Sequence, residues 1–335
     1  MQREPDRWNL ARPGHAWSVL PSRALLHLFS PGNRLSILIY HRVLARPDPL
    51  FPEESAAESF DQQMSELSAC FRIMSLRDAI QGLRKGTLPS RAACITFDDG
   101  YADNAEVALP ILQKHGICAT FFIAAGFLDG GRMWNDTVIE LLRRIPGKIL
   151  DLEGVGLGRF GIDSLSDRRK AIHCLLGQLK YLSPESRQAM VDAMSAATPI
   201  DLPDDLMMTS AQVRSLHNAG MEIGGHTIDH PILARIGNDA ARAEIAGGKE
   251  MLEGMTGGRV RFFAYPNGKP GQDYFRDHVG MVRDLGFDAA VSTAHGAASA
   301  ESDFYQLPRF TPWDRGVIRL TARMVQNMLR TPETA

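Results

Sequence analysis

Two adjacent carboxylates and a glycine follow one apolar run of the sequence. Asp98, Asp99 and Gly100 come directly after residues 92–97. Side chains alternate between the two faces of a strand, so neighbouring aspartates converge only where the strand gives way to a turn, which Gly100 permits. This pattern predicts a metal site. The alternative is a simple turn, which is the common role of an Asp-Asp-Gly sequence.

A pair of histidines much later in the chain offers further metal ligands. His226 and His230 follow the apolar run 221–225. Imidazoles four residues apart face the same way if the segment makes one helical turn. Two imidazoles and one carboxylate leave a fourth coordination position open, which is the pattern of a catalytic zinc rather than a structural one. The alternative is a pair of partly exposed loop histidines.

A third strand end completes the set of candidate site segments. Residues 260–265 form another apolar run, and Pro266, Asn267 and Gly268 follow it. Active sites of parallel α/β barrels gather on the loops at the carboxyl ends of the strands. We therefore expect the three segments to share one catalytic face.

These segments carry a family resemblance. Residues 96–100, 226–230 and 265–268 resemble the ordered motifs of the polysaccharide deacetylases, a group of carbohydrate esterases that includes chitin and peptidoglycan deacetylases. The resemblance covers residues 35–312, and its first two motifs are the most specific. It implies a metal-dependent hydrolase built on a distorted (β/α) barrel.

The resemblance also implies roles for individual residues. Asp98 is similar to the catalytic base of the family, and the backbone N–H of Asn267 is similar to its oxyanion donor. The residues similar to the metal ligands are Asp99, His226 and His230. Imidazole with carboxylate suits zinc, so Zn²⁺ is the expected metal, with cobalt, nickel and iron as alternatives.

Two positions depart from the family pattern. Ala264 stands where an arginine commonly pairs with the base, and Arg309 stands where a histidine is common. If the last predicted strand (304–307) lies beside the first, Arg309 can supply the missing positive charge and keep Asp98 ionised. The alternative for Arg309 is a charge at a strand edge.

The missing histidine leaves the proton donor to be found elsewhere. His41 is the first candidate because it ends the first predicted strand, and its alternative role is a structural hydrogen bond to the opening loops. His295 is the second candidate because it lies in the loop after the predicted strand 287–292. Arginine cannot donate a proton near neutral pH, so Arg309 can only orient or tune.

Apolar runs alternate with helical patterns along most of the chain. Continuous apolar runs bounded by polar residues suit parallel strands that are covered on both faces. The fold class is therefore α/β, a distorted barrel of about seven parallel strands. The predicted strands are 35–41, 92–97, 117–124, 221–225, 260–265, 287–292 and 304–307. The predicted helices are 60–70, 78–83, 104–115, 210–218, 239–255 and 274–285.

Three segments follow from these patterns. Residues 1–34 form a polar N-terminal arm, 35–312 the deacetylase-like barrel, and 313–335 a C-terminal helix and tail. Between about 127 and 208 helical patterns dominate, which predicts a helical insertion beside the catalytic mouth. Trp134 within it can stack on a sugar face or pack the insertion onto the barrel.

Composition excludes some classes of protein. A formal net charge of −2 gives no electrostatic footprint for nucleic acid. The sequence has no apolar run of about 18 residues, so no transmembrane segment is expected. Its early apolar stretch is too short for a signal peptide, which predicts a cytoplasmic enzyme. Nothing in the sequence indicates an oligomeric state.

The expected function is removal of an N-acetyl group from an amino sugar in polysaccharide or glycolipid biosynthesis. The partner is then an N-acetylated sugar or glycolipid. One alternative is hydrolysis of a small non-sugar amide or cyclic imide. Another is a catalytically impaired, metal-containing sugar-binding protein, suggested by Ala264 and Arg309. Retention of Asp98 argues against that reading, because a binding site needs the ligands but not the base.

Overall fold

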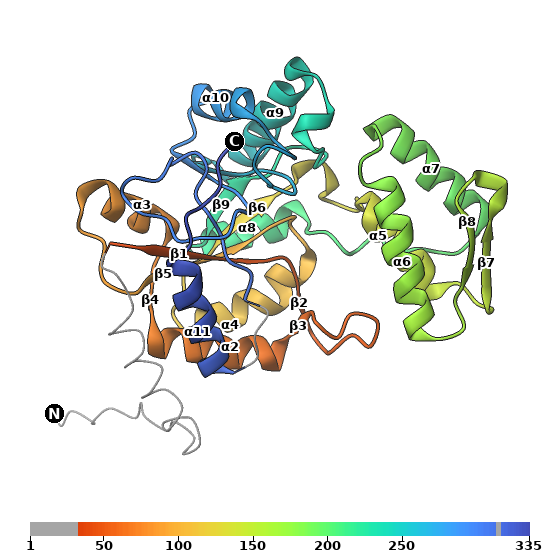
Figure 1. Ribbon diagram of the computed structural model, residues 1–335, viewed down its shortest axis with the longest axis horizontal. Coiled ribbons are helices and arrows are strands. Elements are labelled where there is room, and N and C mark those ends of the chain that lie inside the picture. The colour runs from red at the N-terminus through yellow and green to blue at the C-terminus, as the bar shows by residue number, and fades with distance from the viewer. Residues whose placement is uncertain (1–32, 313–315) are drawn as a thin grey trace.

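A curled sheet of parallel strands forms the centre of the molecule (Figure 1). The computed structural model describes residues 33–312 and 316–335. The sheet order is β1-β5-β6-β9-β10-β11, and β4 pairs with β5 as a seventh strand. Its strands are β1 (Leu35–Tyr40), β4 (Arg72–Ile73), β5 (Ala92–Phe97), β6 (Thr120–Ile123), β9 (Glu222–Gly225), β10 (Phe262–Ala264) and β11 (Ala289–Val291). The predicted α/β barrel of about seven parallel strands is confirmed.

The sheet is closed by an irregular segment rather than by a regular last strand. Parallel bridges join Leu38 to Phe310 and Val291 to Leu307, so residues 307–310 lie between β1 and β11. The prediction of a regular strand at residues 304–307 is wrong. A turn forms there, in which Asp303 accepts a hydrogen bond from the Tyr305 N–H at 2.9 Å. The bridges nevertheless carry Arg309 to the carboxyl ends of β1 and β11.

Aromatic side chains fill the space between β1, β5, β6 and the helix α2. The Phe97 ring stacks on Tyr40 at 5.4 Å and on Phe121 at 4.8 Å between centroids, and Phe60 of α2 meets it edge-on at 5.9 Å. All six residues of β1 and of β5 are buried. Burial on both faces explains why these strands read as continuous apolar runs.

Helices cover the outside of the sheet (Figure 1). They are α2 (Ala57–Cys70), α3 (Leu76–Lys85), α4 (Leu109–Lys114), α8 (Ser210–Asn218), α9 (Asn238–Thr256), α10 (Arg276–Asp284) and α11 (Val317–Met328). A π-helical turn, Asn104–Ala108, precedes α4, and 3₁₀ turns occur at Ala125–Phe127, Glu153–Val155 and Leu233–Arg235. The short strands β2 (Val43–Leu44) and β3 (Ser55–Ala56) pair with each other. Thr209 is the N-cap of α8, and its side chain accepts a hydrogen bond from the Gln212 N–H.

The region predicted to be a helical insertion lies to one side of the barrel (Figure 1). It contains α5 (Trp134–Arg144), β7 (Ile149–Leu152), β8 (Gly158–Gly161), α6 (Leu165–Leu179) and α7 (Pro184–Ala197). Its buried apolar side chains form a cluster separate from the barrel core. The antiparallel β7–β8 hairpin was not predicted, because β8 begins and ends with glycine and carries no β-branched residue.

The structure describes the predicted C-terminal helix but little of the predicted N-terminal arm. The predicted N-terminal arm, 1–34, lies outside the described residues except for 33 and 34. The predicted C-terminal helix corresponds to α11. Within the described ranges, every helix is too short or too polar to cross a bilayer.

The separate core of the insertion can be tested with one substitution and a matched control. Leu175 of α6 is 0% exposed, whereas Leu165 of the same helix is 46% exposed. Leu175→Ala should lower the free energy of unfolding by about 2–5 kcal/mol through loss of buried area and a residual cavity. Leu165→Ala should change it by about 0.5 kcal/mol or less. Denaturant titration of both variants provides the measurement, and equal losses would contradict the assignment of this core.

Candidate metal centre and catalytic cleft

The carboxyl ends of the parallel strands meet at one cleft of about 470 Å³. The barrel lines it with His41, Asp98, Asp99, His226, His230, Ile232, Asn267 and Thr293. The insertion lines it with Met133, Trp134, Asn135, His173, Leu176, Gly177, Lys180 and Arg187. The three motif segments therefore share one face, as their positions after strands predict.

A left-handed turn brings the adjacent aspartates to the same site. Asp99 has φ of 75° and Gly100 has φ of 93°, so the strand breaks directly after Asp98. From the sequence, Gly100 was expected to provide the turn, but the left-handed conformation already begins at Asp99. A non-glycine residue held at positive φ is strained, and such strain is typical of functional sites.

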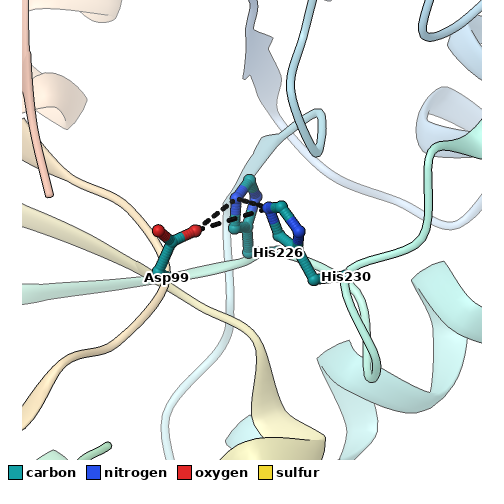
Figure 2. Close-up of side chains that lie close together, drawn as sticks. All are labelled: Asp99, His226 and His230. Carbon is teal, nitrogen blue, oxygen red and sulfur yellow. Dashed lines mark hydrogen bonds and ion pairs between the residues drawn. The ribbon is translucent and has the colours of Figure 1, made fainter. Parts of the chain in front are cut away.

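Asp99, His226 and His230 form a compact group of possible metal ligands (Figure 2). Asp99 Oδ1 lies 3.5 Å from His226 Nε2 and 3.4 Å from His230 Nε2, and the two Nε2 atoms are 3.1 Å apart. Ligand atoms about 2.0–2.2 Å from one tetrahedral ion lie roughly 3.3–3.5 Å from each other. The three side chains therefore fit a single divalent metal and leave one side open to the cleft.

The histidine loop is not helical, which corrects one expectation. Thr227 and His230 have φ of 67° and 51°, and these left-handed residues turn the two imidazoles toward each other. Helix α9 holds the loop, because Glu244 Oε2 accepts hydrogen bonds from the Ile228 N–H at 3.0 Å and the Asp229 N–H at 2.9 Å. Spacing alone could not distinguish this turn from a helical one.

A backbone carbonyl fixes the orientation of His226. Its Nδ1 lies 2.7 Å from the oxygen of Ala264, so Nδ1 donates this hydrogen bond and Nε2 is the nitrogen that faces Asp99 and His230. Only the main chain of Ala264 takes part in this contact. The departure from the family pattern at residue 264 therefore leaves this part of the site intact.

The protonation states of Asp99 and His230 favour binding of a cation between them. Burial raises the pKa of Asp99, but the hydrogen bond with His226 and the positive charge that His230 carries when it is protonated outweigh it and hold that pKa well below its usual range. Burial and the neighbouring His226 lower the pKa of His230 to about 4, so this ring is neutral near pH 7. A carboxylate and a neutral imidazole are the protonation states that metal binding requires.

Arg309 and Asp98 form a buried, bidentate ion pair. The two terminal guanidinium nitrogens lie 2.6 and 2.7 Å from the two carboxylate oxygens, and Arg309 Nε donates to the Ser292 carbonyl at 2.9 Å. Arg309 is 1% exposed, so it is not a charge at a strand edge. Burial raises the pKa of Asp98, but the charge of Arg309 outweighs it and lowers the pKa below its usual value.

Asn267 occupies a turn that exposes its backbone to the cleft. Its φ is 60°, and its carbonyl accepts a hydrogen bond from Thr293 Oγ1 at 2.8 Å. Among the described residues, no protein group accepts a hydrogen bond from the Asn267 N–H. Thr293 was not singled out from the sequence, although its position just after a predicted strand end was a usable signal.

The two candidate proton donors differ in position. His41 is exposed at the end of β1 and lines the cleft with Asp98 and Asp99. Its backbone carbonyl accepts a hydrogen bond from Asn104 Nδ2 at 2.8 Å, whereas its ring bonds to no other described residue. His295 is exposed and does not line the cleft within the described ranges. The structure therefore brings His41, but not His295, to the metal centre.

Sequence reasoning placed the insertion beside the catalytic mouth and singled out Trp134, but it missed the charged residues of the insertion that line the cleft. His173, Lys180 and Arg187 line the wall of the cleft contributed by the insertion. One signal was available for Arg187, because it shares a helical stripe with the buried Val191 and Met194 of α7. A cationic side chain within the apolar stripe of a helix indicates either a buried partner of opposite charge or a ligand-binding site.

Comparisons with known proteins agree with this geometry. The profile of the polysaccharide deacetylase family matches residues 85–146 and 181–290, more than half of the chain, and leaves 147–180 unmatched. YxkH of Bacillus subtilis (strain 168), provisionally named a polysaccharide deacetylase, is 22% identical over 278 residues, which cover 82% of this chain and 70% of YxkH.

Solved structures share the fold. The Streptococcus pyogenes deacetylase PplD, in complex with acetate, matches with a TM-score of 0.59 and 19% identity, covering 90% of this chain and 100% of PplD. IcaB from Ammonifex degensii matches with a TM-score of 0.56 and 19% identity, covering 87% of this chain and 98% of IcaB.

Removing the counter-charge of Asp98 should destabilise the protein in a pH-dependent way. An aspartate whose pKa is lowered by folding contributes stability above its unfolded pKa of about 3.9, and loses it as pH falls through the folded pKa. Arg309→Met leaves a buried carboxylate without a partner, which should cost about 3–5 kcal/mol near pH 7. The pKa of Asp98 should then rise, so the deficit should shrink as pH falls toward 5.

Denaturant titration with chelator at pH 7 and pH 5 measures this deficit. The control is Arg309→Met combined with Asp98→Asn, which removes the charge and should show a smaller deficit that does not depend on pH. Equal deficits at the two pH values in the single variant would contradict the ion-pair assignment.

The close approach of α9 to the histidine loop makes a second prediction. A Cβ added at Gly248 would lie 2.6 Å from the Thr227 carbonyl oxygen, whereas one at Gly254 would meet no atom within 4 Å. Gly248→Ala should therefore lower the free energy of unfolding by about 1–3 kcal/mol. Gly254→Ala, on the same helix, should raise it by up to about 1 kcal/mol. Denaturation curves with the same sign of change for both variants would exclude this packing.

Proposed function

This chain belongs to the polysaccharide deacetylase family, and on that premise we propose that it removes an N-acetyl group from an amino sugar with a divalent metal held by Asp99, His226 and His230. Zinc is the metal that best suits two imidazoles and one carboxylate. The substrate we propose is an N-acetylated sugar in polysaccharide or glycolipid biosynthesis.

One observation carries the proposal. A carboxylate kept ionised by a buried bidentate arginine stands beside a three-residue ligand group in one cleft. A protein that only binds metal and sugar has no use for a buried, charged aspartate that does not join the ligands. Asp98 Oδ2 lies 4.0 Å from His226 Nε2, close enough to reach a water molecule held at the same centre.

The proposed reaction is hydrolysis of the acetamide. A metal bound at the site polarises the carbonyl and makes water acidic enough to react near neutral pH. Asp98 accepts the proton of the attacking water, and Arg309 holds the carboxylate in place through two hydrogen bonds. A new C–O bond forms, the C–N bond breaks, and acetate and a free amine are released.

Two further residues complete the proposed mechanism. The Asn267 N–H donates to the oxygen of the carbonyl as negative charge develops on it, a contact that is typically worth about 3–4 kcal/mol. His41 is the proposed proton donor for the leaving nitrogen, because it lines the cleft with both aspartates and histidine is the side chain that most often serves as a general acid. Arg309 occupies the position of the missing family histidine and serves as a positioning residue.

A substrate panel tests the function directly. Acetate release should be measured from N-acetylated amino sugars of increasing length and from small non-sugar amides, with metal present and with chelator. Release from the sugars that chelator abolishes and added zinc restores is the expected result. Turnover of the small amides alone would overturn the proposed substrate class, and full activity in chelator would overturn metal dependence.

The two adjacent aspartates should fail in different ways. Asp98→Asn should retain stoichiometric metal but lose about 10²- to 10⁴-fold in kcat, because an amide cannot accept the proton of water. Asp99→Asn should instead weaken metal binding, because it removes the charged ligand. Metal analysis after dialysis and acetate release at saturating metal separate the two effects. Identical behaviour of the two variants would refute this division of roles.

A further inference from the structure

The wall of the cleft formed by the insertion carries a buried cation without a counter-charge. Arg187 of α7 is 7% exposed, and its side chain lies over the Trp134 ring at 4.9 Å. Its guanidinium donates one long hydrogen bond, from a terminal nitrogen to the Lys180 carbonyl at 3.4 Å. Among the described residues, no carboxylate lies within 4.0 Å of the Arg187 guanidinium. Burying a charge without a partner is costly.

Lys180 adds a second cation to the same wall. It follows α6, is half-buried, and lines the cleft together with Arg187 and His173. Its ammonium lies 5.6 Å from the Tyr181 ring centroid, and within the described ranges it forms no ion pair. Burial lowers the pKa of both Lys180 and Arg187. Two desolvated cations therefore face one cavity.

The nearby carboxylates do not neutralise this wall. Asp98 is held by Arg309, and Asp99 by the two histidines. Glu185 and Asp273 raise the pKa of Arg187 and Lys180 respectively, but neither forms an ion pair with them. Lys269 acts on Lys180 in the opposite direction, as a like charge. Among the described residues, Arg187 and Lys180 thus line the cleft without an ion pair of their own.

We propose that the substrate carries an anionic group, and that Arg187 and Lys180 bind this group while the N-acetyl group reaches the metal centre. This inference rests on the proposed deacetylase function and narrows its substrate class to acidic amino sugars, bearing a phosphate or a carboxylate. Arginine and lysine are the side chains suited to such oxyanions, arginine through its planar fork and lysine as a point charge.

The stacking of Arg187 on Trp134 fixes where the sugar can lie. One face of the indole is covered by the guanidinium, so that face does not stack on a sugar ring. The same contact restricts the movement of the guanidinium, which reduces the entropy lost when an anion binds. Trp134 therefore serves mainly to hold the cation, and it also lines the cleft.

One neutral and two anionic N-acetylated sugars test the proposal. The probes are N-acetylglucosamine, N-acetylglucosamine 1-phosphate and N-acetylmuramic acid, which are neutral, phosphate-bearing and carboxylate-bearing. Calorimetric binding to the zinc-loaded Asp98→Asn protein avoids turnover, and acetate release by the wild-type protein measures kcat/KM. Loss of one charged hydrogen bond costs about 1.5–3 kcal/mol, which is about 10- to 100-fold in affinity.

Substitutions distinguish anion binding by Arg187 and Lys180 from anion binding by the metal. Arg187→Gln and Lys180→Gln should each reduce the ratio of anionic-sugar affinity to neutral-sugar affinity by about 10-fold or more. Arg187→Lys should retain part of the preference. The controls are Arg169→Gln and Lys170→Gln, exposed cations of α6 that do not line the cleft. Should Arg187→Gln fail to fold, Lys180→Gln carries the same comparison.

Each outcome decides one question. An unchanged preference in the Arg187 and Lys180 variants, or equal binding of neutral and anionic sugars by the parent protein, overturns the proposed anion site. A preference for one anion over the other identifies phosphate or carboxylate. Absence of acetate release from all three sugars and from longer neutral sugars counts against the deacetylase function, and the binding comparison still reports on the anion site by itself.

Discussion

The need to keep one buried carboxylate charged shapes this molecule. Asp98 is buried at the base of the cleft, and Arg309 favours its ionised form by donating to both of its oxygens. That contact requires the barrel to close, because Arg309 lies on the segment bridging β11 to β1. The parallel arrangement then places the neighbouring strand ends, with the ligands and Asn267, around the same point.

Strained backbone provides the second part of the arrangement. Four residues of the site, Asp99, Thr227, His230 and Asn267, have φ between 51° and 75°. Each redirects a side chain or an N–H that regular structure would send elsewhere. Packing against α9, through Glu244 and the missing side chain of Gly248, holds the histidine loop in this conformation. The strain is therefore supported by the scaffold around it.

Much of the fold could be predicted from the sequence, because buried parallel strands appear as continuous apolar runs. The polar motifs that follow these runs mark the strand ends at the cleft. Local pattern could not reveal how His226 and His230 converge, because helical and left-handed turns share the same spacing. It also could not reveal the β7–β8 hairpin, whose second strand begins and ends with glycine. The Arg309 contact required a closure hypothesis, and Arg187 depended on tertiary packing between α7 and Trp134. The family profile leaves residues 147–180 unmatched between its two segments, and Lys180 of the cleft wall lies in that range, whereas Trp134 and Arg187 lie in matched segments.

The separation of Asp98 and Arg309 along the chain has a consequence for biosynthesis. The two residues are 211 positions apart, so a ribosome releases the carboxylate long before its cation. Domains form as the chain emerges from its N-terminal side, and until Arg309 arrives the end of β5 must stay hydrated or take up a proton. A chain interrupted just before residue 309 would hold every proposed metal ligand and still lack the counter-ion of its base. The catalytic pocket is thus complete only after the chain has been made through residue 309.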